Sequence, residues 1–349
     1  MKRRLIFISA IAALSLAAFA ACSGDDDGTA TPASTQAADG SPGAGDRMKI
    51  VTTVAPITSL AENIVGPLAD VEGIVPEGVS SHEYEPPPSI AALLADADVI
   101  FVNGLALEEP TFELAEANKR DDVEVVRLGD GTITEADWKF DFSFPESEGH
   151  PNPHLWPNVQ HSQRYAEIIH DTVVALDPAN AAAYDANYAE LDARLEQLHE
   201  AMLEATATVP EANRKLVTYH DSWAYWAPVY GFTVIGAVQP SDFAEPSARD
   251  IAGIIDQIRD EGVPAIFGSE VYPSPVLEQI ADETGAEYVD DLRDDDLPGD
   301  PGGERHTYIG LMVQNMEIML PALGGDASAL ADVPTGLVFE GETTAVYPQ

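Results

Sequence analysis

The sequence contains very little cysteine and few basic residues. Among its 349 residues there is one cysteine, Cys22. A single cysteine excludes a disulfide within the chain and a zinc site built from several thiolates. Lys and Arg total 17 against 60 Asp and Glu, so the formal net charge is −43. Because nucleic acids and anionic membrane surfaces are themselves negative, they would repel this chain, and we expect no nucleic-acid partner.

The N-terminal residues have the pattern of an export signal followed by a tether. A basic start, MKRR, precedes an apolar run at residues 5–19 that is short for a membrane span. Small residues lie just before Cys22, as in bacterial lipoprotein signals where this cysteine is acylated, although Phe19 stands where such signals usually carry Leu. We therefore expect a lipoprotein signal peptide at residues 1–22 and a disordered tether at 23–47, with the protein extracytoplasmic and anchored to the cell membrane by lipid at Cys22. An ordinary signal peptide with an incidental cysteine is the alternative.

The apolar pattern beyond the tether is typical of an α/β fold. Short runs rich in β-branched residues predict strands at 49–54, 71–75, 98–102, 123–128, 215–219, 233–237, 265–268 and 287–289. Helices are expected at 56–64, 89–94, 222–230, 247–261, 275–284 and 308–320. This alternation predicts two lobes, each with a mostly parallel sheet flanked by helices.

One long helix is expected between the lobes. Residues 178–207 contain no Gly and no internal Pro, and their apolar residues recur at three- and four-residue steps. At 1.5 Å per residue such a helix is about 45 Å long, so it would join an N-terminal lobe at 48–177 to a C-terminal lobe at 208–323 stiffly. Residues 324–349 form a C-terminal extension to which the pattern assigns no function.

Four candidate metal ligands follow predicted strands or lie in loops. They are His82 in SHEYEPPP, His154 in PNPHLWPN, His220 in VTYHDSW and Asp290 in YVDDL. Each alone is explained by an ordinary loop or half-buried position, and Asp290 by the acidic surface run that continues through residues 294–296. Together they would bring two ligands from each lobe, and three imidazoles with one carboxylate make a plausible closed zinc sphere. The spacing by itself does not establish that they converge.

Catalytic interpretations are disfavoured by missing motifs. His220 and Asp221 would be two members of a Ser/His/Asp triad, but the chain has no G-x-S-x-G elbow. A metal-dependent hydrolase with Glu83 or Asp221 as general base would be expected to carry a pair of helical ligands such as HExxH, which is absent. We therefore expect no enzyme. A surface adhesin with a metal site is a further alternative.

Several ordered motifs resemble a known family. From about Met48 to Leu323 the chain is similar to the zinc- and manganese-binding solute receptors of ABC importers, the cluster A-I receptors. The motifs that carry the resemblance are GVSSHEYEPPPS, ADVIFVNGLALE, NPHLWPN, VTYHDSWAYWAPVYGF, EPSARDI, IFGSEVY and YVDDL.

The resemblance implies both a site and a function. It implies that His82, His154, His220 and Asp290 are the metal ligands, with Asp291 as the alternative for the fourth. It further implies a two-lobed receptor with a rigid connecting helix, a monomer, which captures a divalent transition metal ion and delivers it to the permease of an ABC importer.

Asn152 stands where the family often has Asp, a difference that we expect not to matter for ligation, and Glu270 is expected near the site rather than in it. Three imidazoles favour zinc over manganese as the transported ion. The loop at residues 129–153, where zinc receptors of the family often carry many histidines, contains only His150.

Overall fold

The computed structural model describes residues 47–349 except 242, 272–274 and 291. The predicted signal peptide, Cys22 and residues 23–46 of the tether lie outside the described residues. Among the helices that are described, none combines the length and the apolar character needed to cross a membrane.

The N-terminal lobe is built on a four-stranded parallel sheet. Its strands are β1 (Met48–Thr52), β2 (Ala69–Gly73), β3 (Val99–Val102) and β4 (Val125–Arg127), in the order β2-β1-β3-β4. Successive residues of a strand face opposite sides, so Val99 and Phe101 of β3 pack in one core while Ile100 and Val102 pack in another. Helices therefore cover both faces, with α1 (Ala55–Val65) and α4 (Val159–Leu176) on one side and α2 (Ile90–Asp96) and α3 (Glu109–Asn118) on the other.

The C-terminal lobe repeats this arrangement. Strands β5 (Lys215–Thr218), β6 (Thr233–Ala237), β7 (Ala265–Phe267) and β8 (Glu287–Val289) pair in parallel in the order β6-β5-β7-β8. Helices α6 (Ala248–Glu261) and α7 (Pro275–Thr284) pack on one face, and α8 (Tyr308–Ala322) packs on the other. Ser247 caps α6 by accepting the backbone N–H of Asp250, as its position before an amphipathic run predicts.

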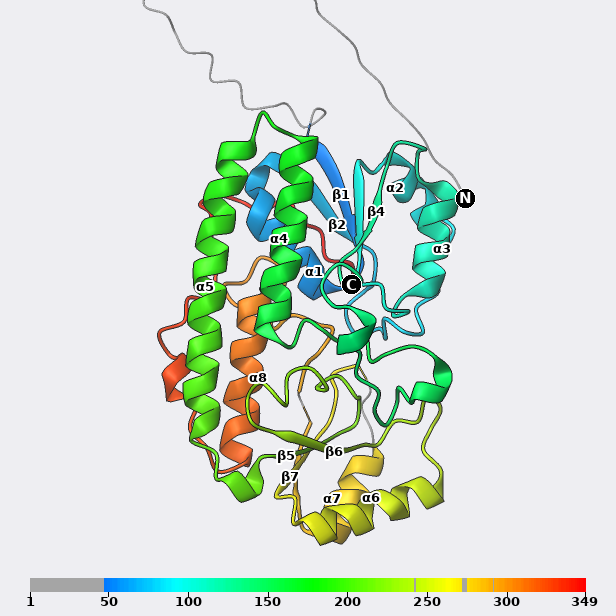
Figure 1. The fold of residues 1–349 in the computed structure, drawn as a ribbon, viewed down its shortest axis with the longest axis vertical. Coiled ribbons are helices and arrows are strands. Elements are labelled where there is room, and N and C mark those ends of the chain that lie inside the picture. The colour runs from blue at the N-terminus through cyan, green and yellow to red at the C-terminus, as the bar shows by residue number, and fades with distance from the viewer. Residues whose placement is uncertain (1–46, 242, 272–274, 291) are drawn as a thin grey trace, which may run out of the picture. The chain divides into compact units, whose positions relative to one another are not determined.

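The long helix is α5 (Ala181–Ala207), which has 27 residues and is about 40 Å long. Its buried side chains Leu191, Leu195, Leu198 and Met202 follow the predicted stripe. The helix packs against α4 and α1 of the first lobe and against α8 of the second, as Figure 1 shows along one side of the molecule. The predicted fold class, two parallel α/β lobes joined by one long helix, is confirmed.

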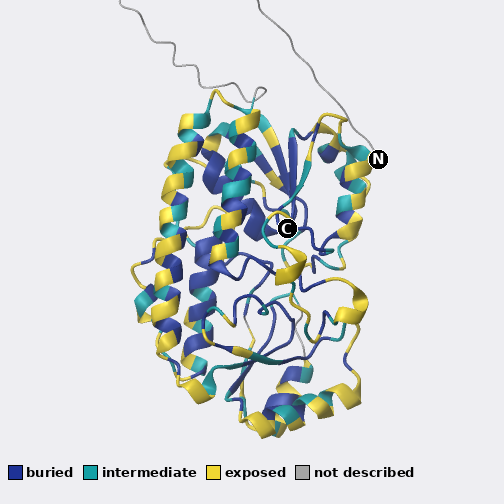
Figure 2. Ribbon diagram, viewed as in Figure 1, coloured by how far each residue is buried: buried dark blue, intermediate teal, exposed yellow. Residues whose placement is uncertain are grey.

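Two parts of the secondary structure differ from the prediction. The helix expected at 222–230 is a series of turns, because Pro228 lacks the amide that a helix needs and the segment instead packs Trp223, Trp226 and Tyr230 into the core. Helices α3 and α4 were not expected from the apolar pattern. Many residues in the segments between the two sheets are buried (Figure 2). The three candidate histidines lie in these segments.

The C-terminal extension packs along both lobes. Arg194 of α5 donates from Nη1 to the Gly336 carbonyl at 2.9 Å, and the Val346 amide donates to the Val71 carbonyl of β2 at 2.9 Å. The extension therefore adds a parallel bridge to the edge of the first sheet, and buried Tyr347 donates its hydroxyl to Glu62 Oε2 at 2.5 Å.

Candidate metal centre

Three imidazole rings converge between the two sheets. Nε2 of His154 lies 3.1 Å from Nε2 of His82 and 3.0 Å from Nε2 of His220. Among the described residues, these three form the one group of three or more potential metal-ligating side chains whose donor atoms all lie within 4.8 Å of one another. His82 comes from the loop after β2, His154 from the loop before α4, and His220 from the end of β5. Three ring nitrogens directed at one point are a donor set that a single cation satisfies.

Burial keeps two of these rings uncharged. It lowers the pKa of His82 and of His154 well below the usual 6.5, and the neighbouring histidines lower both pKa values further. An imidazole must be neutral at the ligating nitrogen to bind a metal ion. The environment therefore favours the protonation state that ligation requires.

Amide side chains fix the orientation of two rings. Nδ1–H of His154 donates to Asn152 Oδ1 at 2.8 Å, and Nδ1–H of His220 donates to Gln239 Oε1 at 2.5 Å. Since an amide oxygen only accepts hydrogen bonds, the ring proton lies on Nδ1 and the Nε2 lone pair faces the centre of the cluster. Neither Asn152 nor Gln239 was predicted from the sequence to orient a ligand.

Two buried aspartates lie beside the imidazoles. Oδ2 of Asp294 is 3.4 Å from Nε2 of His220, and both Asp294 and Asp295 are buried. Each has one buried carboxylate oxygen without a hydrogen-bond partner in the described part of the chain, Oδ2 of Asp294 and Oδ1 of Asp295. Burial raises the pKa of both carboxyls, so without a cation a negative charge there is costly.

Asp290, the expected fourth ligand, does not lie in the cluster. It is exposed at the end of β8, and Asp291, the alternative, lies outside the described residues. The acidic run at 294–296 is not a surface feature, because Glu270 Oε1 accepts the backbone N–H groups of all three residues at 2.9, 3.1 and 3.1 Å and holds them inside. The buried residues Leu292 and Leu297 on either side of that run are the sequence signal that would have indicated an inward-facing segment.

Aromatic rings and a small cavity adjoin the cluster at His82. The ring of Phe243 stacks on His82 at 4.7 Å between centroids, and Phe144 tilts against it at 5.5 Å. A cavity of about 130 Å³ reaches His82, and its lining includes Leu105, Ala106 and both phenylalanines. The backbone φ angles of Leu105, Ala106 and Phe243 are 53°, 64° and 54°, so three non-glycine residues of this lining occupy the left-handed region.

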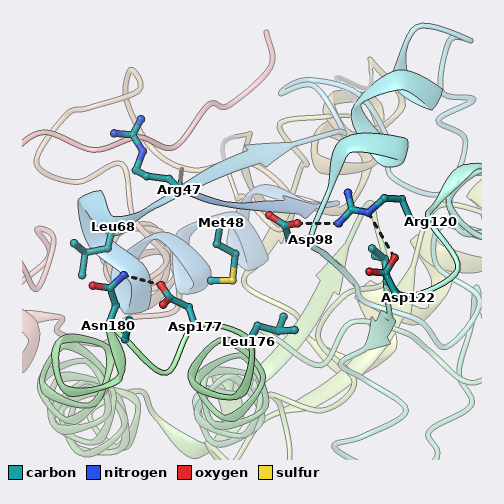
Figure 3. Close-up of a pocket in the computed structure, with 11 residues that line it drawn as sticks. Arg47, Met48, Leu68, Asp98, Arg120, Asp122, Leu176, Asp177 and Asn180 are labelled. Atoms are coloured by element: carbon teal, nitrogen blue, oxygen red, sulfur yellow. Dashed lines mark hydrogen bonds and ion pairs between the residues drawn. The ribbon is translucent and has the colours of Figure 1, made fainter. Parts of the chain in front are cut away.

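A larger cavity of about 490 Å³ lies at the start of β1 and beside the connection between α4 and α5 (Figure 3). Arg120 in its wall pairs with Asp98 at 2.8 Å and with Asp122 at 3.6 Å. Arg47 is paired with Asp70 at 2.6 Å. Because these arginines are already neutralised by aspartates and the lining includes no histidine, this cavity lacks the donor set found at the imidazole cluster.

Comparison with known proteins places the fold and the motifs in context. The family model described as zinc-uptake complex component A, periplasmic, matches residues 50–322. The manganese-binding lipoprotein MntA of Halalkalibacterium halodurans is 30% identical over 321 residues, which cover 92% of this chain and 99% of the relative. The iron-binding protein YfeA of Yersinia pestis is 28% identical over 278 residues, 80% of this chain and 87% of the relative.

Solved structures with a similar fold are also those of metal-binding proteins. The periplasmic zinc-binding protein TroA from Treponema pallidum has a TM-score of 0.72 at 26% identity, covering 79% of this chain and 99% of that one. A manganese-bound periplasmic metal-binding protein from Candidatus Liberibacter asiaticus has a TM-score of 0.66 at 26% identity, covering 79% and 100%. The names of these similar proteins therefore include zinc, manganese and iron.

Proposed function

Because the chain belongs to the family of the periplasmic component A of the zinc-uptake complex, whose members are metal-binding solute receptors and not enzymes, we propose that its imidazole cluster binds one divalent transition metal ion. The chain is a substrate-binding protein of a metal ABC transporter, as its resemblance to that family predicts. The proposed ligands are Nε2 of His82, His154 and His220. The convergence of these three nitrogens is the observation that carries the proposal.

The fourth ligand in this proposal is a carboxylate oxygen of Asp294 or Asp295 in place of Asp290. Both are buried beside the imidazoles, and each has an oxygen that no described residue hydrogen-bonds, whereas Asp290 is exposed. Asp294 Oδ2 lies 3.4 Å from Nε2 of His220. Oδ2 of Asp295 accepts the backbone N–H of Ser81, the residue before His82, at 3.3 Å.

Zinc is the favoured cargo and manganese the second choice. Three imidazole nitrogens and one carboxylate suit zinc, and divalent metals follow an affinity order in which zinc exceeds manganese at such donor sets. Because the similar proteins MntA and YfeA are named for manganese and iron, the metal that this chain binds has to be measured directly. The metal is cargo rather than a resident cofactor, so binding has to be reversible at the transporter.

Release of the metal to the importer would depend on the two-lobed fold. Two of the proposed imidazole ligands belong to the N-terminal lobe, while His220 and the Asp294–Asp295 pair belong to the C-terminal lobe. A small relative displacement of the lobes, driven by docking on the permease of the importer, would separate the ligands and lower the affinity. The stiff α5 helix limits how far the lobes move, so a small displacement is all that this model requires. Lipid attached at Cys22 would keep the monomeric receptor on the outer side of the cell membrane.

The first experiment is a metal competition. The full-length protein is stripped with a chelator, given equal zinc and manganese, and its bound metal is counted by elemental analysis. We expect one zinc per chain that excess manganese does not displace. One manganese per chain, or a mixture, would make it a manganese or dual receptor, whereas no stoichiometric metal would refute the site itself.

A further inference from the structure

We propose that Asn152 is a positioning residue for the metal centre, whose amide both orients His154 and joins its loop to the loop of His220. We further infer that the amide nitrogen is required at this position, because it meets the carboxyl group of Asp141 and the backbone carbonyl of Asp221. The inference rests on the proposed function in so far as His154 and His220 are ligands.

The oxygen of the Asn152 side chain serves His154. Oδ1 accepts the backbone N–H of His154 at 3.0 Å and its ring Nδ1–H at 2.8 Å. Both bonds need an acceptor, and together they hold the ring in one orientation with the Nε2 lone pair directed at His82 and His220. An acceptor alone would be supplied equally well by an aspartate.

The nitrogen of the same amide serves the other loop. Nδ2 donates to the backbone carbonyl of Asp221 at 2.6 Å and to Asp141 Oδ2 at 3.0 Å. Asp221 directly follows His220 in the C-terminal lobe. Asn152 is fully buried, and its side chain uses both donors and both acceptor positions, so no capacity is left for other partners.

An aspartate cannot make the second set of bonds. Its two oxygens only accept when it is ionised, so it replaces neither of the two N–H groups that Asn152 donates to the Asp221 carbonyl and to Asp141. Asp141 is already close to the carboxyl of Asp221, and burial followed by the charge of Asp221 raises the pKa of Asp141 to about 9. A carboxylate at residue 152 would add a buried negative charge beside the Asp141–Asp221 pair.

A carboxylate at residue 152 should act here in the opposite direction from the general case. A carboxylate that accepts from a metal-binding histidine usually raises the basicity of the ligand and strengthens binding. Here we expect Asn152→Asp to weaken binding, because the loss on the Asp141 and Asp221 side outweighs the gain at His154. From the sequence we expected that Asn instead of Asp at residue 152 would not affect ligation. We now infer that it affects metal binding through the neighbours of the amide.

The test is a set of exchanges between amide and carboxyl groups. Zinc affinity is measured by competition with a chromogenic chelator in the full-length protein and in N152D, D141N and the double variant N152D/D141N. We expect N152D to bind zinc about 10- to 100-fold more weakly, the range typical of a lost outer-sphere partner. The double variant should recover at least about tenfold of that loss, because the new amide at residue 141 can donate to the new carboxylate at 152.

A spectroscopic measurement separates positioning from a purely structural role. Nitrogen-15 NMR of the histidine rings reports which ring nitrogen carries the proton. The metal-free unchanged protein should show His154 protonated on Nδ1, and N152A should show a mixture of the two tautomers while its thermal unfolding stays cooperative. A single unchanged tautomer in N152A would overturn the positioning role.

Two further outcomes decide the inference. N152D that binds zinc as tightly as the unchanged protein, or more tightly, contradicts the need for the amide nitrogen, and a double variant as weak as N152D removes Asp141 from the argument. If the unchanged protein itself binds no stoichiometric metal, the proposed function fails instead. If it binds and His154→Ala abolishes binding while N152D does not, only the inference about Asn152 fails.

Discussion

The two lobes hold their candidate ligands in different ways. In the N-terminal lobe, His154 lies between Pro153 and the buried Leu155-Trp156 pair, and its ring is fixed by Asn152, two residues before it. In the C-terminal lobe, the aspartates at 294–296 are held by Glu270, which lies more than twenty residues earlier in the chain. Local sequence therefore identifies the first kind of ligand, whereas the second depends on a tertiary contact that no local motif displays.

The first prediction removes the centre of the imidazole cluster. His154→Ala should reduce zinc affinity by more than about 100-fold, beyond the usual effect of an outer-sphere partner, because its Nε2 is the atom nearest to both other rings. Competition with a chelator measures the effect. His170→Ala is the matched control, because His170 of α4 pairs with Asp185 of α5, and its loss should leave zinc binding unchanged. An unaltered titration in His154→Ala would remove this residue from the site.

The second prediction decides between Asp290, the acidic ligand predicted from the sequence, and Asp294 or Asp295, the acidic ligands proposed from the structure. At least one of Asp294→Asn and Asp295→Asn should weaken zinc binding about 10- to 100-fold. Asp290→Asn should bind like the unchanged protein, because its side chain is exposed. Isothermal titration of all three variants gives the comparison. Loss of affinity in Asp290→Asn alone would restore the assignment made from the sequence.

The third prediction concerns the carboxyl group that holds the acidic segment. Burial raises the pKa of Glu270 well above its usual value, so a neutral amide is a close substitute for its side chain. Glu270→Gln keeps the Oε1 acceptor and should bind zinc within about threefold of the unchanged protein. Glu270→Ala leaves three buried backbone N–H groups without their acceptor, at a cost of about 1–3 kcal/mol each if no water replaces it, and should bind about tenfold more weakly.

The zinc affinities of the Glu270 variants can be compared only if the variants fold. If Glu270→Ala unfolds, its affinity carries no information, and the comparison of Glu270→Gln with the unchanged protein then decides. A large loss of zinc affinity in a folded Glu270→Gln would mean that the negative charge of Glu270, rather than its acceptor, matters to the site. Unfolding temperatures of all variants are measured in parallel.

Features that depend on local sequence could be predicted, whereas features that depend on tertiary contacts could not. The strands, the stripe of Leu191, Leu195 and Leu198 on α5 and the two-lobed fold follow from periodicity, because they depend on residues a few positions apart. The turns at 222–230 do not, since packing of Trp223 and Trp226 overrides helical spacing there. His82 and His220 follow strands whose carboxyl ends lie at one edge of a sheet, whereas the position of His154 before α4 and of Asp294 beside the rings depends on tertiary contacts.

The fourth prediction concerns the pH range of binding. Because burial lowers the pKa of His82 and of His154 well below 6.5, protonation of these two rings should weaken zinc binding only below pH 6.5. The unfolded chain takes up protons at these histidines near pH 6.5 while the folded chain does not, so they make the metal-free protein less stable as the pH falls below 6.5. Nitrogen-15 NMR of the histidine rings of the metal-free protein from pH 8 to 5 tests this, and protonation of either ring above pH 7 would contradict the low pKa values.

The last and smallest effect separates the stability of the N-terminal lobe from its metal site. Tyr347 of the extension donates to Glu62 Oε2 at 2.5 Å, and both side chains are buried. Tyr347→Phe removes one of the two hydroxyl partners of that carboxyl, the other being Thr343, at a cost of about 1 kcal/mol, which lowers the unfolding temperature by a few degrees in a chain of this size. Zinc affinity should stay within about twofold, because neither residue contacts an imidazole of the cluster. If affinity falls while the unfolding temperature does not, the extension acts on the site itself, and the site depends on distant contacts in the N-terminal lobe as it does in the C-terminal lobe.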